Sequence, residues 1–331
     1  MTSTLDLEPT PQAITVRRTR GDRIFRGVLI LGGLTSFLVL AGIFGYLAQS
    51  AAPILQAFGV QFFTESAWYP GDGLLPSEGS TDPAAFGILP MLWGSILIAI
   101  ISLGIAVPLA VGIALSIVYL LPKRTAFGFT VFLDLIAAIP SIVFGLWGFF
   151  VLVPHGILWA AWLNEKLGFI PIFSVEFPAF EQSPFMAGLV LAIMITPIIA
   201  VVTRQIFALV PPELINGAQA LGGSRWTIIR DVVLPFSRGG IIGGAMLGLG
   251  RALGETVAVF FVLQLFFDGV NWYRILESSG GSVASLIIAK FGEASPLEIS
   301  ALFAAALALF VLTLVANAAA ALLVNSSKAK K

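Results

Sequence analysis

The sequence predicts an all-α integral membrane protein with six transmembrane helices. Three observations lead to this prediction: the composition, the number of long uncharged runs, and the uneven distribution of lysine and arginine between those runs. Of the 331 residues, 58% are hydrophobic and only 11% are charged, and the mean hydropathy is +0.98. A water-soluble domain with this composition would expose far more apolar surface than soluble proteins do. We therefore expect the chain to lie in a bilayer.

Six runs reach the roughly 20 apolar residues that a helix needs to cross about 30 Å of hydrocarbon. Each run is expected to be helical, because lipid offers no hydrogen-bond partner to an unpaired backbone amide. Pro108, Pro140 and Pro197 are expected to kink the helices that contain them. The predicted spans are residues 27–48, 87–121, 125–153, 184–203, 239–267 and 299–324.

Positive charges predict that both ends of the chain lie in the cytoplasm. With six spans, 14 of the 18 lysine and arginine residues fall on one side of the membrane. Three fall on the other side, namely Lys166, Arg274 and Lys290, and Arg251 falls inside a span. The expected organisation is a disordered cytosolic tail (1–26), a six-helix membrane domain (27–325) with an extracytoplasmic loop (49–86), and a basic cytosolic C-terminus (326–331).

Residues 211–235 interrupt the apolar pattern on the cytoplasmic side. Apolar residues recur there at helical spacing on both sides of Gly222 and Gly223, Ser224 is placed to cap a second helix, and Pro235 is expected to turn the chain. This helical hairpin is too short to span a membrane and too apolar to be a free loop. It either lies on the bilayer surface or is covered by another protein. A DNA-binding helix-turn-helix is disfavoured, because the flanking spans hold the hairpin against the bilayer.

Several function classes are excluded by what the sequence lacks. The net charge is zero, which gives no reason to expect a nucleic-acid partner, and the absence of cysteine removes thiolate and Cys-zinc chemistry. The phosphate-binding pattern G-x-x-x-x-G-K-[ST] does not occur. We expect no catalytic residue, no metal site and no cofactor in this chain, so any ATP chemistry must come from another protein.

Arg251 and Glu255 are the candidate pathway residues. Arg251 lies near the middle of the predicted span 239–267, where a charge costs roughly 2.5 to 3.5 kcal/mol on insertion scales. A spacing of four places Glu255 on the same face of a continuous helix, so the two are expected to pair. The pair either gates a passing anion, which the planar guanidinium suits, or is a buried ion pair that fixes helix register.

Gly240, Gly244 and Gly248 repeat every four residues in the same span. Small residues at this spacing allow a second helix to approach closely. The neighbour is either another helix of this chain or a helix of another subunit.

The hairpin resembles the EAA loop of ABC importer permeases, E-A-A-x3-G-x9-I-x-L-P. Asn216 stands where that family usually has Glu, and Gly217 stands where it usually has Ala. The resemblance implies a type I ABC importer permease fold in which this loop forms coupling helices that dock on an ATPase. The residues that it assigns to this coupling are Asn216, Gly217, Ala218, Gly222, Arg225, Leu234 and Pro235.

A more extensive resemblance covers residues 27–325. The stretches 234–256 and 139–145 are similar to the C-type permease of the phosphate-specific ABC importer, a binding-protein-dependent transport system. This similarity implies uptake of inorganic phosphate across a bacterial inner membrane. It also implies three partners: a second homologous permease, a cytoplasmic ATPase dimer that binds ATP and Mg²⁺, and an extracytoplasmic phosphate-binding protein.

Two other classes of function are weighed against the importer. A secondary anion transporter would use Arg251, Glu255 and Asp134 as a proton-coupled relay, but the internal repeat typical of that class is not evident. A membrane-embedded enzyme would need a cluster of His, Ser or carboxylate groups at one depth, and the sequence offers none. An ATPase that copurifies with the chain would favour the importer.

Overall fold

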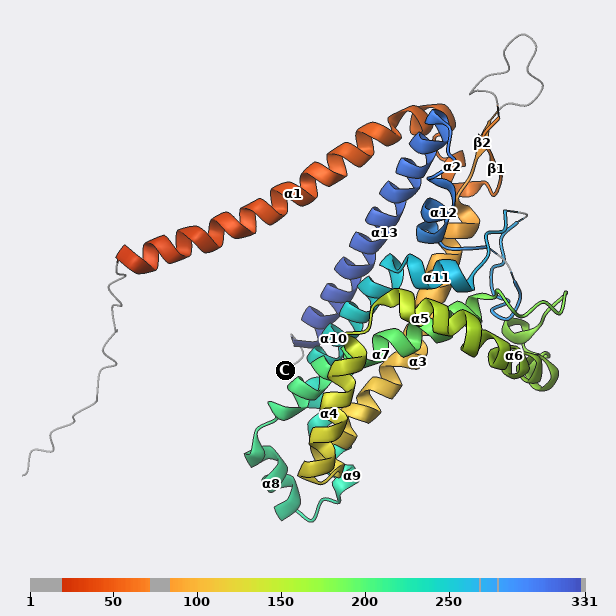
Figure 1. Ribbon diagram of the computed structural model, residues 1–331. Coiled ribbons are helices and arrows are strands. Elements are labelled where there is room, and N and C mark those ends of the chain that lie inside the picture. The colour runs from red at the N-terminus through yellow and green to blue at the C-terminus, as the bar shows by residue number, and fades with distance from the viewer. Residues whose placement is uncertain (1–19, 72–83, 268, 279, 329–331) are drawn as a thin grey trace, which may run out of the picture. The chain divides into compact units, whose positions relative to one another are not determined.

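The computed structural model describes residues 20–71, 84–267, 269–278 and 280–328, and it is helical over most of them (Figure 1). Three of the helices, η1, η2 and η4, have π geometry, and η3 is a 3₁₀ helix. The helices are α1 (Arg20–Phe58), α2 (Gln61–Thr64), α3 (Leu89–Leu115), η1 (Ser116–Leu120), α4 (Lys123–Ala137), α5 (Ser141–Trp147), η2 (Gly148–Leu152), α6 (Val153–Leu167), η3 (Pro171–Phe173), α7 (Pro184–Ala208), α8 (Pro212–Ala220), α9 (Arg225–Ile228), η4 (Ile229–Val233), α10 (Leu234–Gly254), α11 (Val257–Val262), α12 (Val283–Lys290) and α13 (Pro296–Lys328).

Within the described residues, six helices are long and apolar enough to cross a membrane, which confirms the predicted fold class. They are Arg20–Phe58, Leu89–Leu120, Ser141–Leu167, Pro184–Ala208, Arg225–Gly254 and Pro296–Leu322. The contacts divide the chain into two compact units, Met1–Tyr46 and Leu47–Lys331. The described part of the first unit is one continuous stretch of α1.

The first span is longer at both ends than the sequence predicted. Residues 20–26 were expected in a disordered tail, but they are helical, because a helix that has nucleated over the apolar run extends at little cost. At the other end α1 reaches Phe58, where Gly59 ends it at φ +54°, a left-handed conformation that glycine adopts freely. Residues 1–19 of the expected tail, 72–83 of the expected outer loop and 329–331 of the expected C-terminus lie outside the described residues.

The third span begins later than predicted. Pro140 was expected to kink one helix over residues 125–153, but α4 ends at Ala137 and α5 begins at Ser141. Proline removes a backbone donor and disfavours helical geometry in the residue before it, which accounts for a break in place of a kink. The apolar rod is Ser141–Leu167, whereas α4, with 15 residues, is only about 22 Å long. Pro108 and Pro197 do lie inside helices, α3 and α7.

Helix α7 is the centre of the larger unit. Two thirds of its most apolar stretch is buried (67%), and it contacts both α3 and α10, which lie beside it in Figure 1. A Cβ added at Gly240 would stand 2.5 Å from Ile206 of α7, and one at Gly248 would stand 2.6 Å from Ile199. Gly244 also faces α7. The glycine repeat of α10 therefore packs on a helix of its own chain.

The two ends of the larger unit carry different structures (Figure 1). At one end, strands β1 (Trp68–Tyr69) and β2 (Ala85–Phe86) pair antiparallel, with Trp68 opposite Phe86. The Trp68 indole donates a 2.8 Å hydrogen bond to the buried Glu298 at the start of α13. Helices α8 and α9 lie at the other end, so the predicted hairpin is well separated from the β-strands.

Candidate functional site

The hairpin between α7 and α10 forms largely as the sequence predicted. Helix α8 ends at Ala220, and the chain turns through Gly222 at φ +80°. The Ser224 hydroxyl then accepts a 3.2 Å hydrogen bond from the amide of Thr227 and so caps α9. Large apolar side chains are exposed to solvent here, most of all Leu221 at 92% and Trp226 at 66%. An exposed apolar surface of this kind marks a contact site for another molecule.

Pro235 does not turn the chain, which corrects the prediction. Helices α9, η4 and α10 run without interruption from Arg225 to Gly254. In η4 the amide of Leu234 donates to the carbonyl of Ile229, five residues earlier. This π-type widening accommodates the proline, which cannot donate to an earlier carbonyl. The result is a single rod of 30 residues, about 45 Å long, that begins in the hairpin.

The residues assigned to coupling fall into two groups. Asn216, Gly217, Gly222 and Arg225 are exposed on the hairpin. The other three, Ala218, Leu234 and Pro235, are partly buried, and Ala218 and Leu234 pack against a small core around Phe207 and Val233. The first group is available to a partner, whereas the second group holds the hairpin on the bundle.

Arg251 and Glu255 do not share a helix face. This corrects the prediction that the two pair on one continuous helix. Helix α10 ends at Gly254, Glu255 has an extended backbone (φ −74°, ψ 118°), and α11 begins at Val257. The Glu255 carboxylate accepts a 3.3 Å hydrogen bond from the amide of Ala258, in the first turn of α11. It therefore satisfies one of the amides that a helix leaves free at its N-terminus.

Arg251 lies in the last turn of α10, and no ion pair joins it to Glu255 in the described part of the chain. Its Nε atom is buried and has no hydrogen-bond partner. Leaving a buried donor unpaired is costly, so the guanidinium is placed to gain from binding an anion. The break between α10 and α11 interrupts an apolar run, a feature that membrane proteins tolerate where the backbone is enclosed by protein or lines a cavity.

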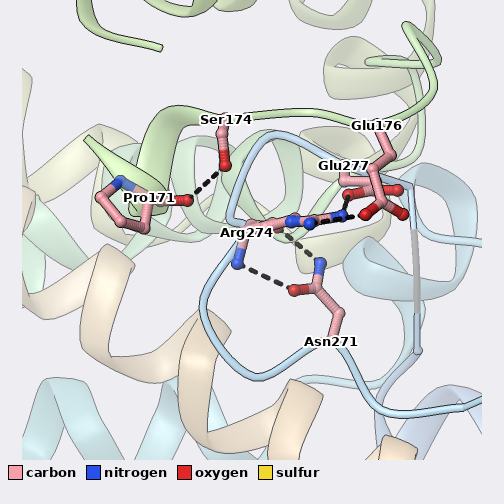
Figure 2. A network of polar contacts seen from close by, with 6 residues as sticks. All are labelled: Pro171, Ser174, Glu176, Asn271, Arg274 and Glu277. Atoms are coloured by element: carbon pink, nitrogen blue, oxygen red, sulfur yellow. Dashed lines mark hydrogen bonds and ion pairs between the residues drawn. The ribbon is translucent and has the colours of Figure 1, made fainter. Parts of the chain in front are cut away.

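Arg274, in the loop before α12, is in the opposite situation (Figure 2). Arg274 donates from Nη2 to Glu176 at 2.7 Å and from Nη1 to Glu277 at 3.3 Å. The side chain of Asn271 brackets the Arg274 backbone, donating to its carbonyl at 2.6 Å and accepting from its amide at 2.8 Å. The two carboxylates raise the pKa of Arg274, and the guanidinium lowers the pKa of Glu176. Arg274 thus ties the loop before α7 to the loop before α12.

A known family of membrane proteins matches two thirds of the chain. Residues 106–328 fit the family model described as "Binding-protein-dependent transport system inner membrane component". The chain belongs to this family. It is accordingly a multi-pass membrane component of a transport system, in agreement with its six apolar helices.

Its sequence similarity to other members of the family extends over nearly its whole length. It is 40% identical over 319 residues to the phosphate transport system permease protein PstC of Mycobacterium leprae, covering 95% of this chain and 97% of that one. It is 38% identical over 317 residues to the phosphate transport system permease protein PstC 2 of Mycobacterium tuberculosis, covering 95% of each.

Solved structures of ABC transporters share its fold. A chain of a bacterial alginate ABC transporter, solved with an alginate-bound periplasmic protein, superimposes with a TM-score of 0.54 at 17% identity, over 92% of this chain and 96% of that one. A chain of the inward-facing MetNI methionine ABC transporter gives a TM-score of 0.51 at 15% identity, over 73% of this chain and 94% of that one.

Two polar features of this family member were missed by the sequence reasoning. One is the Arg274 cluster, of which the sequence reasoning above names only Arg274, as one of three cations on the outer side. The other is Asn317 in α13, whose side-chain nitrogen lies 3.9 Å from the position that a Cβ on Gly250 would take. An amide in the middle of an apolar span is a signal that the sequence does carry, because intramembrane polar residues are uncommon and tend to be functional.

Proposed function

We propose that this chain is a transmembrane permease that imports inorganic phosphate, driven by ATP hydrolysis in separate subunits. The observation that carries the coupling is the unbroken helix from Arg225 to Gly254. It joins an exposed hairpin at one end of the bundle to Arg251 in its last turn. The phosphate transport permeases related to it over 95% of its length support the choice of substrate.

The hairpin is the docking surface for an ATPase dimer in this proposal. Asn216, Gly217, Gly222 and Arg225 are exposed there together with Leu221 and Trp226. The ATPase subunits bind ATP and Mg²⁺, and this chain binds neither. A displacement of the hairpin moves the whole rod, because a continuous hydrogen-bonded helix transmits motion along its axis. Arg251 therefore shifts when the ATPase subunits close or open.

Arg251 contacts the passing anion, and Glu255 has a positioning role. The guanidinium presents a planar set of donors that fits two oxygens of a tetrahedral oxyanion. Glu255 caps α11 through Ala258 and so holds the break that leaves Arg251 at a helix end. Competition between phosphate and Glu255 for the guanidinium has no support in this geometry, because Arg251 and Glu255 form no ion pair among the described residues.

The assembly that we propose surrounds this chain with three proteins and lipid. A second homologous permease faces it in the membrane, the ATPase dimer lies on the cytoplasmic hairpin, and a phosphate-binding protein docks outside. Lipid covers the remaining apolar surface. The distribution of lysine and arginine supports cytoplasmic termini in the bacterial inner membrane.

A proton-coupled relay is less well supported. Asp134 of α4 lies 4.0 Å from Arg204 of α7, and Arg204 also donates a 2.8 Å hydrogen bond to Thr130. These contacts give Asp134 a role in holding α4 to α7, and no ion pair in the described part of the chain joins it to Arg251 or Glu255.

The deciding experiment purifies the chain from membranes with its partners and reconstitutes them. We expect an ATPase to copurify and its activity to rise when phosphate-loaded binding protein is added. An Arg251→Ala complex, present at normal levels, is expected to take up almost no phosphate, whereas Arg238→Gln at the exposed side of the same rod leaves uptake intact. Phosphate uptake without any ATPase, or full uptake by Arg251→Ala, would refute the proposal.

A further inference from the structure

A second polar site lies beyond α11, on the side that the charge distribution assigns to the outside. A pocket of about 390 Å³ is formed by α11, the segment that follows it and the end of α12. Its walls include Phe260, Phe261 and Phe267, and its polar groups are Gln182, Gln264 and Lys290. This volume falls in the range of small-molecule sites, which combine apolar walls with a few polar groups.

Lys290 differs from the other two outer cations. Lys166 is paired with Glu165 at 2.7 Å, and Arg274 is paired with Glu176 and Glu277. Among the residues that the structure describes, Lys290 forms no ion pair, and it is the only charged residue that lines its pocket. The side chains of Gln182 and Gln264 likewise form no hydrogen bond with a described residue. One cation and two amides are thus left to face the pocket.

We propose that this pocket is an outer binding site for a small tetrahedral oxyanion, with phosphate as the ligand if the proposed function holds. An ammonium group donates three hydrogen bonds and an amide donates two, and hydrogen bonds between a charged donor and an anionic acceptor are the stronger kind. Phe260, Phe261 and Phe267 supply apolar walls that offer the ammonium group no competing partner.

The position of the pocket fits a stage before Arg251. Phe260 and Phe261 belong to α11, whose first turn Glu255 caps. This helix has six residues and is about 9 Å long. The pocket therefore includes the end of α11 that lies away from the break, and Arg251 lies in the last turn of α10 on the other side of that break. The Arg274 pocket offers no such route for an anion, because both Glu176 and Glu277 line it.

A purely structural role for Lys290 is the competing explanation. Lys290 is the last residue of α12, and a cation near a helix C-terminus stabilises the helix by about 0.3 to 1 kcal/mol. Such a role is independent of phosphate, so the two explanations differ in what phosphate does to the chemistry of the pocket.

The chain contains no cysteine, so a single introduced cysteine is its only thiol, and the complex without that cysteine gives the background labelling. Ala289 lines the pocket and is exposed, and Ala289→Cys keeps all three polar groups. In right-side-out vesicles holding the whole complex, we expect an anionic methanethiosulfonate to label this cysteine faster than a cationic one. Inorganic phosphate is expected to slow the labelling severalfold. Adding Lys290→Gln removes both effects, and adding Lys290→Arg preserves them.

Controls separate this proposal from its alternatives. Phe177→Cys, an exposed position in the Arg274 pocket, is expected to be labelled at the same rate with and without phosphate. If Ala289→Cys prevents assembly, Phe260→Cys replaces it, because Phe260 lines the pocket, is exposed and is not one of its polar groups. The proposal is overturned if phosphate gives no protection, if Lys290→Gln retains it, or if only the binding protein gives it, since the pocket would then be a protein-docking surface. Each of these outcomes leaves Arg251-dependent uptake unaffected, so the proposed function is judged separately.

Discussion

Arg251 and Arg274 lie only 23 positions apart, yet their surroundings are opposite. Arg274 is held by two carboxylates from two loops, and these contacts raise its pKa. Arg251 has no carboxylate partner in the described chain, and its Nε atom is buried without a hydrogen bond. Arg274 is fully occupied in holding the protein together, and Arg251 is available to something that arrives from outside the chain.

This difference shows why a carboxylate near an arginine in sequence is weak evidence for an ion pair. Glu255 is four positions from Arg251 but caps α11, whereas Glu176 is 98 positions from Arg274 and lies 2.7 Å from it. The pairing depends on where helices end and on which loops meet.

Replacing each arginine with lysine tests the contrast directly. Arg251→Lys keeps the charge but loses the planar set of donors, and a hydrogen bond to a charged group contributes about 1.5 to 3 kcal/mol. We expect phosphate uptake to fall roughly tenfold or more. Arg274→Lys retains one exposed ion pair, and such pairs contribute at most about 1 kcal/mol, so uptake should stay within about twofold. Equal losses in the two variants, at equal membrane levels, would remove the distinction.

Two tryptophans extend the comparison to apolar side chains. The Trp68 indole is bonded to Glu298 inside the chain, whereas Trp226 on the hairpin is 66% exposed. Tryptophans at the centre of an interface often contribute about 2 kcal/mol or more to binding. We expect Trp226→Ala to weaken association with the ATPase subunits roughly thirtyfold, measured by copurification. Trp159→Ala, at an exposed position of α6, is the matched control and should retain the ATPase.

Two substitutions of Glu255 distinguish a helix cap from an ion-pair partner. Glu255→Gln keeps an oxygen that accepts from Ala258, whereas Glu255→Ala removes the cap at a cost of about 0.5 to 2 kcal/mol. We expect the glutamine variant to transport phosphate nearly normally and the alanine variant to lose severalfold. If both variants fail equally, the negative charge matters and the capping role is wrong. Phosphate uptake per copy of the complex is the measurement.

Much of the fold follows from the sequence because its signals are local. Run length and hydropathy predict six membrane helices, and a glycine pair followed by a serine predicts the hairpin turn that Gly222 and Ser224 form. The residues at which helices end are harder to predict from the sequence. Pro235 lies inside a helix because the π geometry of η4 accommodates a residue without an amide donor. The sequence alone does not distinguish such a proline from one that ends a helix.

The sites depend on contacts that sequence spacing does not encode. The run 239–267 is long enough to form one continuous helix, and only Gly254 and the polar pair Glu255 and Thr256 hint that the helix breaks there. The Arg274 cluster joins two loops that are separated in sequence by all the helices from α7 to α11, and nothing local in either loop indicates the other. The glycine repeat is visible in the sequence and predicts close helix packing. Only the structure, in which Gly240 packs on Ile206, identifies the neighbouring helix as α7.

Acid should loosen the Arg274 tie only weakly and only at low pH. Arg274 lowers the pKa of Glu176 below its ordinary value of 4.5, so the ionised pair contributes stability that is present above pH 4.5 and is lost as the pH falls through the lowered pKa. Proteolysis of the loops at residues 171–183 and 263–282 should therefore be unchanged between pH 7 and about pH 5 and should rise only in stronger acid. Glu176→Gln should show the faster cleavage already at pH 7, because its amide cannot form the ion pair. Faster proteolysis between pH 7 and about pH 6 would show that a different group controls the loops. The Arg274–Glu176 ion pair would then not be the contact that holds the two loops together.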